Sequence, residues 1–182
     1  NRFLTQSDAG TPMGELIRRF WVPGILSEGL PERDGAPKKI TVMGEDLLAF
    51  RDSEGRVGII DQYCPHRGAN LWLGRNEECG IRCVYHGWKF SVTGELLDIP
   101  SEPAGSPMRC NPNIRAKAYP VHEAGGIVWA YLGPQECVPP LPQMEFMSLP
   151  AQNFYTSKCL MKCNYQQALE GSIDTAHLTF LH

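Results

Sequence analysis

The sequence predicts an α+β fold, in which an all-β domain is followed by the start of an α+β domain. Short apolar runs alternate with Gly- and Pro-containing turns between residues 38 and 132, which predicts short strands. Four prolines between residues 134 and 142 predict a linker. Apolar side chains then recur at three- and four-residue steps in residues 164–182, which predicts a helix. We divide the chain into an N-terminal arm (1–35), a first domain (36–145) and the start of a second domain (146–182).

The N-terminal arm contains a predicted short helix. Thr11 is a suitable N-cap. Pro12 suits the first helical position, because the N–H that proline lacks has no intrahelical partner there. The apolar side of this helix consists of Leu16, Ile17, Phe20 and Trp21. Pro23 is expected to end it.

The first domain begins with strands that we expect to form hairpins. Residues 39–43 and 47–51 flank Gly44-Glu45-Asp46, and residues 89–91 and 95–98 flank Val92-Thr93-Gly94. Further strands are expected at residues 57–60, 81–84 and 127–132. Residues 99–117 contain four prolines and are expected to form a long surface loop.

Two loops in this domain offer the same mixture of metal-binding side chains. They are Cys64-Pro65-His66-Arg67-Gly68 and Cys83-Val84-Tyr85-His86-Gly87-Trp88, with 16 residues between His66 and Cys83. Two thiolates and two imidazoles fit a 2Fe–2S cluster with both cysteines on one iron and both histidines on the other, the Rieske arrangement. Neutral imidazoles leave such a cluster less negative than four thiolates do, so it accepts an electron more easily. We therefore expect Cys64, His66, Cys83 and His86 to bind this cluster.

Two other interpretations compete with the cluster. Two cysteines and two histidines also form tetrahedral zinc sites, but zinc fingers usually pair Cys with Cys and His with His. In this chain each half is mixed, which favours iron–sulfur over zinc. A purely structural role for the four side chains requires two nearly identical loops to arise by coincidence.

Asp174, His177 and His182 form a second candidate metal centre. Asp174 and His177 lie three residues apart on the predicted helix and therefore share a face. His182 lies five residues further, so the helix must end, kink or carry a π-type turn near Thr179 if both imidazoles bind one metal. Two histidines and a carboxylate are the ligand set of non-haem Fe(II) oxygenases. From spacing alone, Asp174 could be the third ligand.

Together, these motifs resemble the alpha (terminal oxygenase) subunits of the Rieske non-haem iron ring-hydroxylating oxygenases. The Rieske proteins of respiratory complexes carry an extra cysteine in each loop, where this chain has Ala69 and Tyr85. Residues 74–80 and 98–103 are most similar to the phthalate dioxygenase-like group. The resemblance implies a Rieske iron–sulfur domain followed by a catalytic domain with a helix-grip-like antiparallel sheet, mostly beyond residue 182.

The resemblance also assigns roles to the C-terminal residues. In the family, the histidines that match His177 and His182 bind a mononuclear iron, and the third ligand is a carboxylate further along the chain. The aspartate that matches Asp174 instead bridges an iron-binding histidine and the Rieske histidine of a neighbouring subunit. This implies that Asp174 is an inter-subunit electron-transfer bridge in a homotrimer, or in a multiple of a trimer.

The activity that the resemblance implies is that of a terminal oxygenase. It takes electrons from an NAD(P)H-dependent flavin/iron–sulfur reductase and uses O2 at a mononuclear Fe(II). The substrate is expected to be aromatic, such as a phthalate or benzoate, and to be mono- or dihydroxylated. The alternatives are an O-demethylating Rieske monooxygenase, a non-catalytic Rieske electron carrier and a zinc-binding structural module.

Composition narrows the possible partners and the compartment. The net charge of −3 gives no support for nucleic-acid binding. No apolar run approaches the roughly 20 residues that span a bilayer, so no membrane association is expected. Five of the seven cysteines lie outside the two loops, in no disulfide-scaffold pattern, which favours a reducing, cytoplasmic compartment. Of these, Cys79 could be mistaken for a ligand and is expected to be structural, whereas His122 suits a strand or the surface.

Overall fold

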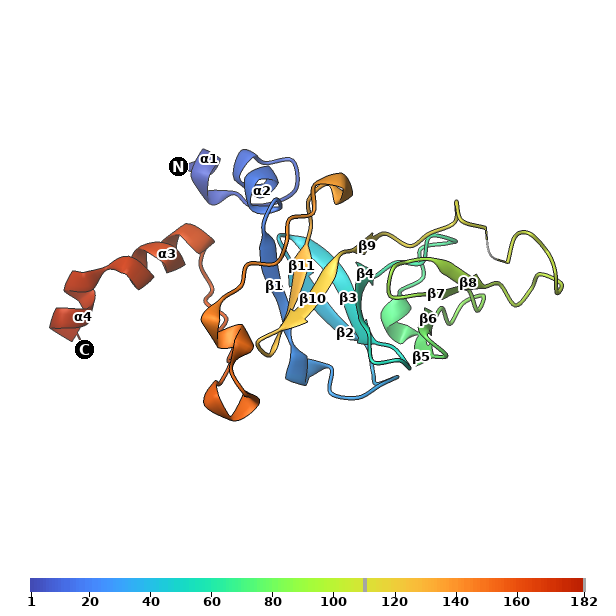
Figure 1. Cartoon of the computed structure of the whole chain (residues 1–182). Helices are drawn as coiled ribbons and strands as arrows, with labels where there is room; N and C mark the ends of the chain where they lie inside the picture. Colours follow the sequence, from blue (N-terminus) through green and yellow to red (C-terminus); the bar gives the residue numbers. More distant parts are fainter. Residues whose placement is uncertain (110, 182) are drawn as a thin grey trace.

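Three small antiparallel sheets form the body of the protein in the computed structural model, which describes residues 1–109 and 111–181. One sheet has the order β1-β11-β10, the second β2-β3-β4-β9 and the third β5-β6-β7-β8. Figure 1 shows the third sheet at one end of the molecule and the C-terminal helices at the other. In the described residues no helix combines the length and the apolar character that a membrane crossing requires.

The second sheet forms the centre of the fold and confirms the first predicted hairpin. It consists of β2 (Lys38–Val42), β3 (Glu45–Arg51), β4 (Val57–Asp61) and β9 (Ala118–Tyr119). Val42 pairs with Glu45, so the turn has two residues, Met43 (φ 51°) and Gly44 (φ 77°). Two successive positive φ angles are typical of the type I′ turn, whose twist matches that of a hairpin.

The first sheet contains a strand that the sequence pattern did not reveal. It consists of β1 (Trp21–Leu26), β10 (Val121–Ala124) and β11 (Ile127–Tyr131). The predicted N-terminal helix, α2 (Pro12–Ile17), begins with Thr11 as its N-cap, as expected. It ends well before Pro23, and Trp21 pairs with Tyr131 instead of extending the helix. Pro23 lies in β1, next to an irregularity in the register with β11. A second short helix, α1 (Arg2–Thr5), precedes α2.

The third sheet carries the second predicted hairpin. It consists of β5 (Arg75–Glu77), β6 (Gly80–Arg82), β7 (Lys89–Phe90) and β8 (Leu96–Asp98). A hydrophobic core lies between this sheet and the central sheet, and its fully buried members include Phe50, Ile60, Leu71 and Phe90. A second core lies between the central sheet and the β1-β11-β10 sheet.

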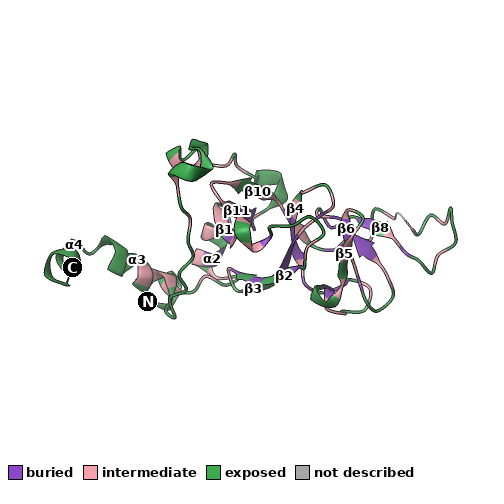
Figure 2. Cartoon of the chain, turned by 90° about the horizontal axis from the view of Figure 1, so that it is seen from below, coloured by how far each residue is buried: buried purple, intermediate pink, exposed green. Residues whose placement is uncertain are grey.

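The C-terminal segment contains two helices rather than one. After residue 134 the described chain has only 3₁₀ turns until α3 (Tyr165–Ile173), which is followed by α4 (Thr175–Leu181). The described residues show a break at Asp174, before His177, and none near Thr179, which lies within α4. The discontinuity expected between His177 and His182 is therefore not seen in the described residues, which end at 181. No residue of α3 or α4 is buried, and Figure 2 shows both helices extending from the body with exposed surfaces.

Candidate metal centre

The first cysteine–histidine loop follows β4 and ends at a 3₁₀ turn, Leu71–Leu73. The Cys64 N–H donates to the carbonyl of Ala69 at 2.8 Å, and the Gly68 N–H donates to the carbonyl of Cys64 at 2.8 Å. Gly68 has a φ of 67°, a left-handed conformation that glycine adopts without strain. The loop is therefore a closed turn. The Cys64 side chain lies on its buried side, and the His66 side chain lies on its outer side.

The second loop joins β6 to β7 and has the same backbone geometry. The Cys83 N–H donates to the carbonyl of Trp88 at 2.8 Å, and the Gly87 N–H donates to the carbonyl of Cys83 at 3.0 Å. Gly87 has a φ of 73°. A Cβ atom at Gly87 would lie 2.8 Å from Cγ of Pro100, so glycine is needed here for space as well as for conformation.

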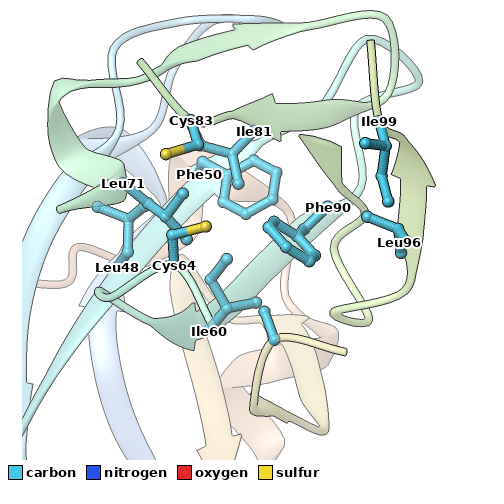
Figure 3. Packing of buried hydrophobic residues seen from close by; sticks show 11 residues of the cluster. Leu48, Phe50, Ile60, Cys64, Leu71, Ile81, Cys83, Phe90, Leu96 and Ile99 are labelled. Carbon is cyan, nitrogen blue, oxygen red and sulfur yellow. The ribbon is translucent and has the colours of Figure 1, made fainter. Parts of the chain in front are cut away.

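The two cysteines lie side by side at the edge of the hydrophobic core. Each is only 3 % exposed, and Figure 3 shows their sulfur atoms beside Phe50 and Leu71. Burial, with a further contribution from the neighbouring Cys83, raises the pKa of the Cys64 thiol to about 11. The backbone N–H groups of His66 and Arg67 lower it but do not offset the burial. A pair of thiolates at this position therefore requires a cation to compensate their charge.

The two histidines meet on the outer side of the loops. Their ring centroids lie 4.7 Å apart, and His86 is exposed whereas His66 is half-buried. Trp88 stacks on His66, and Tyr85 lies against His86 with 3.9 Å between ring centroids. Partial desolvation lowers the pKa of His66, and the neighbouring His86 and Arg67 lower it further. The neutral imidazole, which is the form that binds a metal, is thereby favoured.

These four side chains fit a Rieske 2Fe–2S cluster. Both sulfur donors come from the buried side and both imidazoles from the solvent side, as expected for a cluster with an inner Cys-bound iron and an outer His-bound iron. Backbone N–H groups already point at the Cys64 sulfur, and such groups also stabilise a negatively charged cluster. The structure thus brings together the four ligands predicted from the sequence.

An ionic network supports the second loop and was not predicted from the sequence. Arg82, the residue before Cys83, donates from Nη1 to the Gly87 carbonyl at 2.8 Å and to Asp98 at 3.0 Å. Its Nε donates to Glu77 at 2.6 Å, and Asp98 also accepts from Arg109. Burial opposes the charge on Arg82, but the hydrogen bonds to Glu77 and Asp98 outweigh it and raise the pKa of the guanidinium. An arginine before the motif gives no sequence signal that separates this role from an ordinary strand residue.

The second candidate centre is only partly described. Asp174 accepts hydrogen bonds from the backbone N–H groups of Ala176 at 3.0 Å and His177 at 3.2 Å, so it caps α4. The Asp174 carboxylate therefore contacts the backbone of His177 at the break between the two helices. His182 lies outside the described residues. Figure 1 shows this centre at the opposite end of the molecule from the two cluster loops.

Two further residues with metal-binding side chains lie outside both candidate centres, and His122 occupies a strand at the surface, as expected. Cys79 lies near Asp52 and Glu54 and not with Cys64 and Cys83. The Asp52 carboxylate is already hydrogen-bonded to Arg56. His122 lies exposed on β10, with its ring against Trp21. Neither Cys79 nor His122 reaches the cluster loops.

Comparison with known proteins supports this description of the site. Residues 20–120 match the model of the Rieske [2Fe-2S] domain, and residues 130–182 match the model described as LigXa C-terminal domain like. The chain is 44 % identical over 182 residues to the phthalate 4,5-dioxygenase oxygenase subunit of Pseudomonas putida. It is 45 % identical over 183 residues to the 3-chlorobenzoate-3,4-dioxygenase oxygenase subunit of Comamonas testosteroni. Both alignments cover 100 % of this chain but only 41 % of the relative.

Solved structures agree with the sequence comparisons. Apo dicamba monooxygenase matches with a TM-score of 0.61 and 26 % identity over 70 % of this chain and 38 % of that one. A complex of an oxygenase and a ferredoxin of carbazole 1,9a-dioxygenase matches with a TM-score of 0.56 and 33 % identity. This second match covers 68 % of this chain and 31 % of that one. The fold is therefore the one found in oxygenases that carry a Rieske domain.

Proposed function

Because the chain belongs to the Rieske [2Fe-2S] domain family, we propose that it is part of the terminal oxygenase component of a Rieske-type system. One observation carries the proposal: the cluster loops are joined, in one chain, to a helix break that places Asp174 beside His177. An electron carrier needs only the loops. The C-terminal helices add side chains suited to a second iron, as an oxygenase requires.

Within the Rieske domain each ligand pair has a distinct part. The buried Cys64 and Cys83 would hold one iron of the cluster, and His66 and His86, on the outer side of the loops, would hold the other. The bound cluster supplies one electron at a time to the oxygen chemistry. The exposed edge of His86 is the natural exit for that electron, because it is the ligand with the least protein between it and a partner.

The mononuclear site is assigned to the C-terminal helices. His177 and His182 are the histidines that would bind the Fe(II). The third ligand, a carboxylate, is assigned to a part of the oxygenase outside residues 1–182. Asp174 lies at the break between α3 and α4, where its carboxylate accepts from the backbone N–H of His177. We assign to this carboxylate the link between His177 and a cluster histidine of a neighbouring subunit. The electrons come from an NAD(P)H-dependent flavin/iron–sulfur reductase.

The two centres of one chain lie at opposite ends of the molecule, which favours electron transfer between subunits (Figure 1). We therefore assign the oxygenase a homotrimer, or a multiple of one, in which each cluster faces the mononuclear iron of the next subunit. A mixing experiment tests this. Full-length Cys83→Ser subunits lack the cluster and His177→Ala subunits lack the second iron. Co-assembled subunits regain turnover if electrons cross between chains, and stay inactive if they do not.

The substrate class that we assign is an aromatic carboxylate. The names of the two curated relatives refer to phthalate and to 3-chlorobenzoate, which share a ring that carries a carboxylate. The test supplies the full-length protein with its reductase, NADH and O2, together with phthalates, benzoates and methoxybenzoates. Hydroxylated acids support the proposal, whereas formaldehyde release from methoxybenzoates points to O-demethylation. Absence of any product from the iron-loaded protein contradicts the substrate class.

Metal content separates the oxygenase from the other two classes of protein. A full-length oxygenase binds more than two iron atoms per chain, an electron carrier binds two, and a zinc module binds none. We also assign the protein to the cytoplasm, because the four described cysteines outside the cluster loops, Cys79, Cys137, Cys159 and Cys163, form no disulfide, as a reducing compartment allows.

A further inference from the structure

The second cluster loop has a support that the first loop lacks. Both loops close with the same two backbone hydrogen bonds. Only the second has an arginine directly before its cysteine, where the first has the exposed Tyr63. The Arg82 guanidinium crosses the base of the loop and bonds to the Gly87 carbonyl, four residues beyond Cys83. It therefore links the two ends of the segment that carries Cys83 and His86.

The guanidinium is itself held from two other directions. Glu77 on β5 and Asp98 on β8 accept its remaining hydrogen bonds, and Asp98 is also paired with Arg109 in the loop after β8. The Arg82 side chain is 14 % exposed and that of Asp98 is 19 % exposed, so solvent screens this network less than a surface pair. A planar group with five fixed donors suits three acceptors in three directions, which a lysine cannot satisfy in the same way.

Arg82 also places a positive charge next to the cluster ligands. It lines a cavity of about 230 Å³ together with Cys83, Gly87 and Val84. Reduction adds an electron to the cluster, so a nearby positive charge favours the reduced form and a nearby negative charge disfavours it. Net charge and hydrogen bonding near the sulfurs are two of the factors that set the potential of such clusters.

We propose that Arg82 is a positioning residue for the Rieske cluster, which fixes the Cys83–His86 loop through Gly87 and raises the cluster's reduction potential through its charge. Asp98 helps to hold Arg82 in place through a hydrogen bond, but its negative charge lowers the reduction potential of the cluster. This inference concerns the cluster alone and does not depend on the oxygenase reaction or its substrate.

The test measures the midpoint potential and the electron paramagnetic resonance spectrum of the reduced cluster in full-length, iron-loaded variants. Arg82→Gln removes the charge and the bridge, and we expect a lower midpoint potential and altered g values. Arg82→Lys keeps the charge but cannot make all three bonds. It should keep a potential near that of the wild type and lose its cluster faster on dilution.

Two further variants keep the proposal testable if Arg82→Gln fails to accumulate as a folded protein. Asp98→Asn removes a negative charge from the same network, and we expect a higher midpoint potential. Arg75→Gln is the matched control, because Arg75 lines the same cavity and pairs with the same Glu77 but is 72 % exposed. It should leave the potential and the spectrum unchanged.

Opposite shifts for Arg82→Gln and Asp98→Asn support the electrostatic role, because a merely structural contact would not change sign with charge. Wild-type potentials and spectra in Arg82→Gln and Asp98→Asn overturn the proposal. Shifts in Arg75→Gln as large as those in Arg82→Gln also overturn it, since they would mean that any charge on this surface has the same effect.

Discussion

The indole of Trp88 lies parallel to the imidazole of His66, with 4.2 Å between ring centroids and 1° between ring planes. Trp88 belongs to the second loop and His66 to the first, so the stack joins the two halves of the site. The ring orientation of a metal-binding histidine is usually fixed by the groups around it. Here a flat aromatic surface fulfils part of that role.

Replacing Trp88 by leucine should therefore loosen His66. We expect the variant to lose about 0.5–1.5 kcal/mol of interaction free energy between the two rings. The cluster should be released faster, and the g values of the reduced cluster should change. Iron content and visible absorbance after dilution measure the first effect. Trp72→Leu is the control, since Trp72 is 43 % exposed and contacts Lys39 rather than a ligand. Equal cluster loss in both variants would contradict a specific role for the stack.

The buried thiols give a second prediction. Cys64→Ser should abolish the Rieske absorbance, because a serine hydroxyl is a poor substitute for a thiolate at iron and the cluster needs both sulfurs. Cys79→Ser should retain two iron atoms and the full absorbance, although Cys79 lies only four residues before Cys83. Iron and sulfide analysis of the two purified variants checks both statements. A colourless Cys79→Ser variant would mean that the ligand set has been assigned wrongly.

An ion pair on the other side of the fold gives a pH-dependent prediction. Arg51 donates to both carboxylate oxygens of Glu123, at 2.6 and 2.9 Å, and this bidentate pair lowers the pKa of Glu123 below its usual 4.5. A carboxylate with a lowered pKa stabilises the fold above its unfolded pKa, and this contribution is lost as the pH falls through the folded pKa. The Glu123 side chain is 35 % exposed, so the contribution at neutral pH is about 0.5–1 kcal/mol.

The thermal midpoints of wild type and Glu123→Gln should therefore differ at pH 7, remain apart down to about pH 4.5, and converge only as the pH falls further, through the lowered pKa of Glu123. Comparing the two proteins at each pH removes the effect of acid on the cluster, which both share. Glu95→Gln serves as the control, because Glu95 is exposed and its contact with Arg115 is 3.5 Å long. A gap between wild type and Glu123→Gln that stays constant while the pH falls from 7 to well below 4.5 would rule out the ion pair as its cause.

The grouping of the four candidate cluster side chains could be predicted from the sequence, because a mixed Cys/His spacing is a local signal and the loops that carry it close on themselves. The network around Arg82 could not, because Glu77, Arg82 and Asp98 meet only once β5, β6 and β8 have paired. β1 could not be predicted for the same reason. Trp21–Leu26 becomes a strand by pairing with β11, about 105 residues further along the chain.

The break in the C-terminal helix illustrates a different limit. The spacing of His177 and His182 predicted a discontinuity near Thr179, but α4 is continuous through Thr179 and the break lies before His177. The carboxylate of Asp174 decides the position, because it accepts from the N–H groups of Ala176 and His177 and so begins a new helix. An aspartate such as Asp174 is a possible N-cap, but it is equally compatible with a continuous helix when it lies within an apolar repeat. The sequence therefore did not locate the break.

This double use of Asp174, as a cap and as the proposed bridge between subunits, allows its two roles to be separated. Asp174→Asn keeps an oxygen that can accept from the same N–H groups, so α4 should form as in the wild type. It loses the negative charge that the bridge requires, and turnover of the full-length oxygenase should fall by roughly 100-fold while both metals stay bound. Asp174→Ala should lose turnover and, in addition, about 0.5–2 kcal/mol of helix stability.

Single-turnover reduction and oxidation of the cluster, followed optically, is the direct measurement for these variants. In Asp174→Asn the cluster should be reduced at the normal rate by the reductase and reoxidised slowly in the presence of substrate and O2. If it is reoxidised as fast as in the wild type, Asp174 is only a helix cap and the electron crosses between subunits by another route. Slow reduction would instead place the defect in the transfer of electrons from the reductase to the cluster.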